Sequence, residues 1–203
     1  MPKSLFVVIE GIDRSGKTTL ARALQASLAE RGIEVKHLRY PHRESTTGET
    51  IDRALKGGKK LSKEALHLLF AANRWEDSES LSSFLADENS SCTPSSSRIV
   101  LCDRYILSGA SYSIANGLPE DFALAADKGL RAPDLTLFLD VSPESTAARG
   151  GFGDEIYERV DFQWKVYREM KNLLPGYTHA IIPTTDPKTT HATALALIVP
   201  LLE

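Results

Sequence analysis

Cysteine is scarce in this sequence, with Cys92 and Cys102 the two among its 203 residues. Two cysteines are too few for a disulfide framework, and neither stands at metal-ligand spacing from a histidine cluster. We therefore expect free thiols in a reducing compartment, with Cys102 packed in an apolar run and Cys92 exposed in a loop. Neither thiol is expected to take part in the chemistry.

The sequence also lacks an excess of charge of either sign, because its formal net charge is −3. Such a balance offers no general attraction for nucleic acid or for an anionic membrane. Any phosphate would have to be held by individual, placed cations. A small phosphorylated ligand therefore fits this chain better than a polymer does.

Long hydrophobic runs are missing as well. The longest, residues 192–202, contains Thr193 and Pro200 and is too short to span a membrane, so it is expected to be a C-terminal helix packed on the core. The apolar run at residues 5–9 is too short for a signal peptide and ends in a motif rather than a cleavage site. We expect a cytoplasmic protein without a membrane span, and a nuclear presence stays open.

The composition that is present, 42% apolar and 25% charged, is typical of a globular protein, and the length suits one domain over residues 1–203. Short β-rich runs alternate with helix-period segments, which predicts an α/β fold with a parallel sheet. The five expected strands cover residues 5–10, 34–39, 99–102, 135–140 and 180–183. Helices are expected to start near Lys17, Glu49, Lys63, Leu107, Glu120, Ser142, Glu155 and Lys188. The serine-rich segment 89–97 is expected to be a loop.

Residues 11–18, GIDRSGKT, match the phosphate-binding pattern G-x-x-x-x-G-K-[ST]. They follow a hydrophobic strand and open an amphipathic helix, so backbone N–H groups and the positive end of the helix would converge on a polyphosphate. Lys17 would reach the β- and γ-phosphates, and Thr18 would be a ligand of Mg²⁺. The motif predicts a P-loop NTPase fold.

A P-loop by itself is shared by kinases, GTPase switches and ATPases. Arg14 favours a kinase, because a guanidinium inside the loop can act on the transferring phosphoryl group as an arginine finger supplied by the same chain. A solvated surface arginine is the alternative. No N-K-x-D sequence for guanine recognition is present, so the switch is the weaker hypothesis.

Four segments, in this order and spacing, resemble the thymidylate kinase family: residues 10–19 (EGIDRSGKTT), 40–43 (YPHR), 68–76 (LLFAANRWE) and 103–105 (DRY). Residues 133–135 and the glycine-rich segment around Phe152 extend the resemblance along nearly the whole chain. The helix with Phe-x-x-Asn-Arg-Trp-Glu is specific to this family. The resemblance implies a five-stranded parallel sheet flanked by helices, as in nucleoside monophosphate kinases. It also implies transfer of the γ-phosphoryl group of ATP to dTMP with Mg²⁺ as cofactor, and a homodimer with helix packed on helix.

Phe70 and Arg74 are four residues apart on an expected helix and therefore share one face. On periodicity alone a core phenylalanine beside a surface arginine is the better interpretation. The resemblance implies instead that Phe70 stacks on the base and that Arg74 donates to a carbonyl oxygen such as thymine O4. Arg43 and Arg104 follow two strands whose ends face the P-loop, and their planar forks suit a clamp on the acceptor phosphate.

Other residues take their expected roles mainly from the resemblance. Asp103 would lie near Mg²⁺ and act through a coordinated water, although a helix cap is the alternative. Asp13 would accept a hydrogen bond from the 3′-hydroxyl, and Tyr112 would lie beside the sugar and disfavour a 2′-hydroxyl.

The expected catalytic residues are Arg14, Lys17 and Arg104. Those expected to bind ATP are Gly11, Asp13, Arg14, Ser15, Gly16, Lys17, Thr18, Thr19 and Arg149. Those expected to bind dTMP are Asp13, Tyr40, Arg43, Phe70, Arg74, Arg104, Ser108, Tyr112 and Tyr157, and those expected at the metal are Thr18 and Asp103.

A lid is expected at residues 149–157, where three glycines follow a short expected helix. In the family, members with an arginine in the P-loop tend to have lids short of catalytic cations, which agrees with Arg14. Ile156, Tyr40 and His42 stand where other residues are commoner in the family. A kinase of the same fold for another nucleoside monophosphate, and a nucleotide switch, stay open as alternatives.

Overall fold

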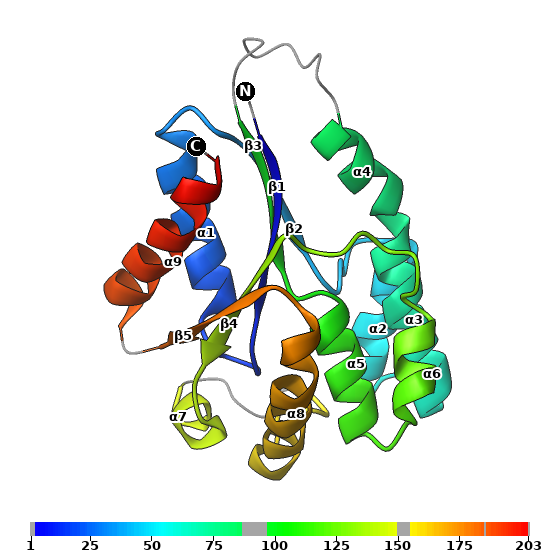
Figure 1. Ribbon diagram of the computed structural model, residues 1–203. Coiled ribbons are helices and arrows are strands. Elements are labelled where there is room, and N and C mark those ends of the chain that lie inside the picture. Colours follow the sequence, from blue (N-terminus) through cyan, green and yellow to red (C-terminus); the bar gives the residue numbers. More distant parts are fainter. Residues whose placement is uncertain (1–2, 87–96, 150–154, 185, 203) are drawn as a thin grey trace.

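A parallel sheet forms the centre of the computed structural model, which describes residues 3–86, 97–149, 155–184 and 186–202 (Figure 1). Its strands are β1 (Ser4–Glu10), β2 (Glu34–Arg39), β3 (Arg98–Asp103), β4 (Leu135–Asp140) and β5 (His179–Pro183). They are hydrogen-bonded in the order β2-β3-β1-β4-β5. The predicted α/β class and all five predicted strands are confirmed, with boundaries shifted by one residue at most.

The helices in chain order are α1 (Lys17–Ala29), α2 (Thr46–Leu55), α3 (Lys63–Glu76), α4 (Ser78–Ala86), α5 (Ile106–Ala115), α6 (Glu120–Ala125), α7 (Pro143–Ala147), α8 (Val160–Leu173) and α9 (Pro187–Leu202), with a 3₁₀ turn, η1, at Leu174–Gly176. The helix predicted to start near Glu155 starts at Val160, and Glu155 lies in a turn before it. Helix α4 was not among the predicted helices. Within the described residues, no helix is long and apolar enough to cross a membrane.

The central strand β1 is buried on both faces, as expected for a parallel sheet covered by helices. Val7 and Ile9 face a cluster with Leu24 of α1 and Ile198 of α9. On the opposite face, Phe6 and Val8 pack with residues that include Leu81 of α4. Figure 1 shows α1 and α9 on one side of the sheet and α4 and α5 on the other.

Two further apolar clusters join helices to one another and to the sheet. Helices α2 and α3 pack together through Ile51, Leu55 and Leu66. Helices α5 and α8 pack with β4 through residues that include Leu107, Phe138, Val166 and Met170. Cys102 is buried in β3 as predicted, whereas Cys92, most of segment 89–97 and most of the predicted lid lie outside the described residues.

Candidate active site

The P-loop joins the end of β1 to the start of α1, and two glycines allow its path. Gly11 has a φ of 145°, and a Cβ placed on it would lie 2.9 Å from the carbonyl oxygen of Leu139. Gly16 has a φ of 104° and precedes the first residue of α1. A side chain would be strained at either position. The two glycines therefore let the chain turn tightly from the end of β1 into α1. Such a turn suits a loop whose backbone N–H groups bind an anion at the start of a helix.

Lys17 is buried, and its ammonium folds back over the P-loop. Its Nζ donates to the carbonyl oxygen of Ile12 at 2.6 Å and to Ser15 Oγ at 3.1 Å. Burial lowers the pKa of Lys17 to about 7, and the charge of Arg104 contributes to the lowering, while Asp103 and Asp13 oppose it. An anion in the loop would stabilise the charged ammonium, because an opposite charge favours the ionised form.

Arg14 lies at the crest of the loop with a φ of 59°. Its Nε is 3.1 Å from Glu158 Oε1, and its carbonyl oxygen accepts a hydrogen bond from Nη1 of Arg149. In the described residues, the two non-glycine residues with positive φ are Arg14 and Arg104. Such backbone costs about 1–3 kcal/mol and concentrates at functional sites. Both predicted catalytic arginines therefore have a backbone that the surrounding structure has to enforce.

Thr18 and Asp103 meet at the foot of the loop. Thr18 Oγ1 donates to Asp103 Oδ2 at 2.6 Å, although the two residues are 85 positions apart in the sequence. Asp103 is the last residue of β3 and caps no helix, because the following helix α5 begins at Ile106. A hydroxyl and a carboxylate side by side, next to a phosphate-binding loop, match the oxygen ligands that Mg²⁺ takes. In the described residues no cluster of three or more acidic, histidine or cysteine side chains forms a separate metal site.

Asp13 is held from two sides. Its carboxylate binds the Arg104 guanidinium through Oδ1 and accepts a hydrogen bond from Gln163 Nε2 at Oδ2, 2.7 Å away. Its backbone N–H donates to Gln163 Oε1 at 3.0 Å. The carboxylate thus faces the acceptor side of the loop and not the phosphate cradle. Gln163, fully buried on α8, is a site residue that the sequence did not reveal.

Arg104 occupies the centre of the site. Its Nη1 donates to the carbonyl oxygen of Gly11 and to Ser108 Oγ, both at 3.1 Å, and its Cζ lies 5.3 Å from the centre of the Tyr112 ring. Burial opposes the charge on Arg104, but Tyr112, Asp13 and other neighbours outweigh it and raise the pKa of the guanidinium. The arginine stays ionised and fixed in direction.

The start of α5 beside Arg104 is held by Glu10, which the sequence analysis did not single out as a functional residue. Its Oε1 accepts from the backbone N–H groups of Tyr105 at 2.9 Å and Ser108 at 3.1 Å, and the Ser108 hydroxyl also binds this carboxylate. A carboxylate at a helix N-terminus is favourable because it satisfies free N–H groups and faces the positive end of the dipole.

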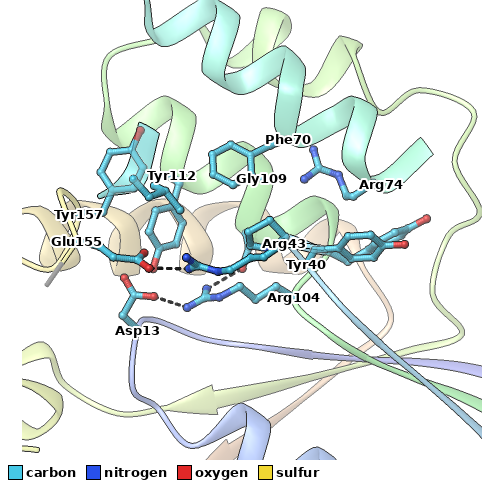
Figure 2. Close-up of a pocket in the computed structure, with 14 residues that line it drawn as sticks. Asp13, Tyr40, Arg43, Phe70, Arg74, Arg104, Gly109, Tyr112, Glu155 and Tyr157 are labelled. Carbon is cyan, nitrogen blue, oxygen red and sulfur yellow. Dashed lines mark hydrogen bonds and ion pairs between the residues drawn. The ribbon is translucent and has the colours of Figure 1, made fainter. Parts of the chain in front are cut away.

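Arg43 follows β2 and is bound by two carboxylates. Its Nη1 binds Asp52 of α2, and its Nη2 lies 2.6 Å from Glu155 Oε1 (Figure 2). Burial opposes the charge on Arg43, but the hydrogen bonds that it donates to these two carboxylates outweigh this effect and raise its pKa. Asn73 of α3 fixes the preceding residue, since its Oδ1 accepts from the backbone N–H of His42 at 2.7 Å.

All the residues predicted to bind dTMP line one pocket of about 590 Å³, its open mouth included. They are Asp13, Tyr40, Arg43, Phe70, Arg74, Arg104, Ser108, Tyr112 and Tyr157. Figure 2 shows Phe70 and Arg74 reaching down from the same helix, with Arg43, Arg104 and Asp13 below them. The pocket therefore has an aromatic and a cationic side chain on one side and, on the other, two arginines paired with the carboxylates of Glu155 and Asp13. The ring of Tyr40 also lines the pocket, and its centre lies 5.9 Å from the centre of the Tyr105 ring.

A second hollow lies on the other side of the P-loop. Of the residues predicted to bind ATP, Ser15, Gly16, Thr19 and Arg149 line it. The rest of the lining comes from α1, from the connection between β5 and α9, and from α9 itself: Leu20, Ala23, Thr184, Asp186, Pro187 and Thr190. The sequence offered no pattern for this side, because these residues form no phosphate motif. The P-loop thus lies between two hollows, an arrangement that suits a donor and an acceptor nucleotide.

Comparisons with known proteins show the family of this chain. A family model described as thymidylate kinase matches residues 9–193. A thymidylate kinase of Plasmodium falciparum is 40% identical over 171 residues, which cover 84% of this chain and 77% of the relative. One of Arabidopsis thaliana is 41% identical over 165 residues, which cover 81% of this chain and 59% of the relative.

Among solved structures, a thymidylate kinase from Candida albicans, described as having broad substrate specificity, matches with a TM-score of 0.84. The match is 31% identical and covers 98% of this chain and 92% of the other. It confirms the predicted P-loop fold with a five-stranded parallel sheet. The chain belongs to the thymidylate kinase family.

Proposed function

We propose that the protein transfers the γ-phosphoryl group of ATP to dTMP, giving dTDP and ADP. The observation that carries this proposal is the pocket beside the P-loop, in which Phe70 and Arg74 face Arg43 and Arg104. A base would stack on Phe70 and accept a hydrogen bond from Arg74. A monophosphate would then extend toward the two arginines on the other side of the pocket.

The acceptor phosphate would lie between Arg43 and Arg104. Both guanidiniums already bind carboxylate oxygens, Arg43 those of Asp52 and Glu155, and Arg104 that of Asp13. Phosphate oxygens offer the same acceptor chemistry with more charge, and arginine binds them in a bidentate way. Tyr112 beside Arg104 would contact the sugar, and Asp13 would accept from its 3′-hydroxyl.

The reaction needs no general base, because the acceptor oxygen is already ionised. Transfer then depends on placing this oxygen in line with the γ-phosphorus and on stabilising the charge of the moving group. Lys17 would leave its contacts with Ile12 and Ser15 to bind the β- and γ-phosphates, and Arg14 would act on the transferring group. Arg104 would hold the attacking phosphate.

Thr18 would hold Mg²⁺ directly, and Asp103 would hold it through water. The ion, when bound with ATP, would neutralise charge on the phosphate oxygens. The nucleoside part of ATP would lie in the second hollow, beside Thr19 and Arg149. Arg149, at the start of the predicted lid, already contacts the P-loop through the carbonyl oxygen of Arg14.

Association as a homodimer is the further proposal that the surface supports. Leu68 and Trp75 are seven residues apart on α3, so they share one face, and they are 49% and 40% exposed. Phe122 of α6, 36% exposed, is a further exposed apolar side chain, and its ring centre lies 5.6 Å from that of the buried His67 of α3. A second copy of the chain would cover these side chains. The two nucleotides are the other expected partners, in the cytoplasm or also in the nucleus.

A coupled ADP-release assay tests the activity. With Mg-ATP present, dTMP, dUMP, dGMP, dCMP, AMP and thymidine would be compared at one concentration, with and without EDTA. We expect a clear preference for dTMP and no turnover in EDTA. Acceptor-independent hydrolysis alone would favour a nucleotide switch and contradict the proposal.

The broad substrate specificity described for the Candida albicans relative makes another deoxynucleoside monophosphate the second candidate acceptor. In the same assay, a higher rate with dGMP or dUMP than with dTMP would favour that candidate. The roles of Lys17, Thr18 and Arg14 would then survive, whereas the assignment of the base contacts to Phe70 and Arg74 would be wrong.

A further inference from the structure

Arg74, which lines the pocket, forms a fully buried ion pair with a residue that no sequence motif indicated. Its Nε lies 2.9 Å from Asp127 Oδ1 and its Nη2 lies 2.7 Å from Asp127 Oδ2. The two side chains are 3% and 1% exposed. This is a bidentate arrangement, in which both carboxylate oxygens meet one edge of the guanidinium and fix its plane.

Asp127 belongs to the turn that follows α6, and this turn is anchored to α3 independently of the ion pair. Trp75 Nε1 donates to the carbonyl oxygen of Ala126 at 2.9 Å, and the indole ring lies against Gly129. Within the turn, the backbone N–H of Leu130 donates to the carbonyl oxygen of Asp127 at 3.1 Å. The carboxylate is therefore presented to Arg74 from a fixed backbone.

The bidentate contact uses the Nε and Nη2 edge of Arg74 and leaves Nη1. No acceptor in the described part of the chain is hydrogen-bonded to Nη1, and Arg74 lines the nucleotide pocket. Gly109 of α5 makes room for this pose, because a Cβ there would lie 2.6 Å from both Nη1 and Nη2 of Arg74. The guanidinium rests on the bare backbone of α5.

Stability alone is a weak reason for such a pair. Burying two charges carries a desolvation cost that their attraction often does not exceed, so apolar residues would hold two helices together at least as well. The contact between Trp75 and Ala126 already joins these elements. The ion pair instead fixes the direction of the Arg74 guanidinium, which would otherwise be the mobile end of a flexible side chain.

We propose that Asp127 is a positioning residue that holds the Arg74 guanidinium in the space left by Gly109 and aims its Nη1 at a carbonyl oxygen on the acceptor base. The pair would thereby select bases with a carbonyl group at C4, such as thymine and uracil, over cytosine, which has an amino group there. This inference rests on the proposed kinase activity and deepens it.

The first test is the variant Asp127→Asn, which keeps the shape of the side chain but removes the charge. We expect the KM for dTMP to rise about tenfold, the range for a lost hydrogen bond to a charged group, with the KM for ATP unchanged. The ratio of kcat/KM for dTMP over dCMP should fall by a similar factor. The ratio for dTMP over dUMP should stay constant, because both bases have the C4 carbonyl.

General damage to the protein would lower kcat/KM for dTMP, dCMP and dUMP together and would leave the ratios between them unchanged. Asp161→Asn is the matched control, since it removes an exposed pair with Arg159 at the start of α8. It should leave both ratios unchanged. A folded Asp127→Asn variant with an unchanged dTMP to dCMP ratio would overturn the proposal.

Gly109→Ala provides a second route that removes no charge. The added methyl group would lie 2.6 Å from Nη1 and Nη2 and would therefore push the guanidinium out of its pose. The same loss of dTMP over dCMP selectivity is expected, and this variant decides the question if Asp127→Asn does not fold. Selectivity unchanged in Gly109→Ala would count against the inferred pose of Arg74.

A double-mutant cycle separates positioning from structure. If Asp127 acts through Arg74, Asp127→Asn should have no further effect on the KM for dTMP in an Arg74→Gln background. Full additivity of the two changes would overturn the inference. A wild-type enzyme without dTMP-dependent ADP release would instead contradict the proposed activity, so the two failures are distinguishable.

Discussion

Arg14 combines an unfavourable backbone with a side chain that is paired with Glu158. Its φ of 59° and its ion pair with Glu158 hold the guanidinium near the P-loop crest, where a transferring phosphoryl group would pass. An arginine finger of this kind contributes by stabilising charge in the transition state and not by binding the acceptor.

We therefore expect Arg14→Ala to lower kcat by about three orders of magnitude while the KM for dTMP changes by a few-fold at most. Steady-state kinetics with saturating Mg-ATP would measure both. Arg31→Ala, at an exposed arginine just after α1, is the control and should behave like the wild type. A large loss of dTMP binding with turnover unchanged would refute the role of Arg14.

Phe70 illustrates how one residue can serve packing and recognition together. Its ring is half-buried against the cluster between α2 and α3 and also lines the nucleotide pocket. Stacking of an aromatic side chain on a base contributes about 1–3 kcal/mol. Phe70→Ala should therefore raise the Kd for dTMP about tenfold or more, with the Kd for ATP unchanged, as measured by calorimetry. Unchanged dTMP affinity would contradict the stacking assignment.

At the scale of elements, helix α3 connects the base end of the pocket to its phosphate end. Phe70 and Arg74 face the pocket, while Asn73 points to the connection between β2 and α2. The Asn73 amide donates to Ser45 Oγ and Thr47 Oγ1, both at 2.9 Å. The Phe-x-x-Asn-Arg-Trp-Glu segment thus positions the loop that contains Arg43.

Asn73→Ala should lower the free energy of unfolding by about 2 kcal/mol, because it removes a buried amide that accepts from the backbone N–H of His42 and donates to Ser45 and Thr47. The KM for dTMP should rise as well, since Arg43 follows His42. Urea unfolding and steady-state kinetics would measure the two effects. Asn172→Ala, at an exposed position of α8, is the control. Lost stability with an unchanged KM would show that the network does not position Arg43.

At the scale of the whole molecule, the exposed Leu68 and Trp75 lie, by helical spacing, on the opposite face of α3 from Phe70 and Arg74. Covering Leu68 and Trp75 in a homodimer would remove apolar area from water and steady the helix that contains Phe70 and Arg74. Helix α3 would then contribute both to the dimer interface and to the acceptor pocket.

We expect the wild type to have the mass of a dimer in light scattering at micromolar concentration, and Leu68→Glu to shift it toward the monomer. A buried glutamate without a partner would lose its hydration in the interface, which disfavours association. Leu201→Glu, at an exposed leucine of α9, is the matched control and should keep the wild-type mass. A monomeric wild type would contradict the proposal.

The sequence by itself was sufficient for features that depend on neighbouring residues. Short β-rich runs predicted all five strands, and the three central ones, β1, β3 and β4, are the most apolar because they are buried on both faces. The P-loop was predicted because its glycines, Lys17 and Thr18 lie within eight positions and their roles follow from that local spacing. The family motifs also indicated residues that the structure brings into one pocket.

Local patterns failed where the signal was weak or had more than one interpretation. The sequence predicts the start of a helix at Glu155, whereas the structure has a turn there and α8 begins five residues later at Val160. Helix α4 follows α3 after a single residue, Asp77, so no break in the pattern separates the two. Neither the turn before α8 nor the start of α4 has a strong periodic signal that would mark a boundary.

The tertiary structure alone decided which distant residues fix the functional side chains. Gln163 holds Asp13 from 150 positions away, and Asp127 holds Arg74 from 53 positions away. Such pairs leave no periodicity or motif, because each partner only has to be delivered to the same place by a different element. The left-handed backbones of Arg14 and Arg104 were equally hidden, since only packing around them can enforce a conformation that their own residue type disfavours.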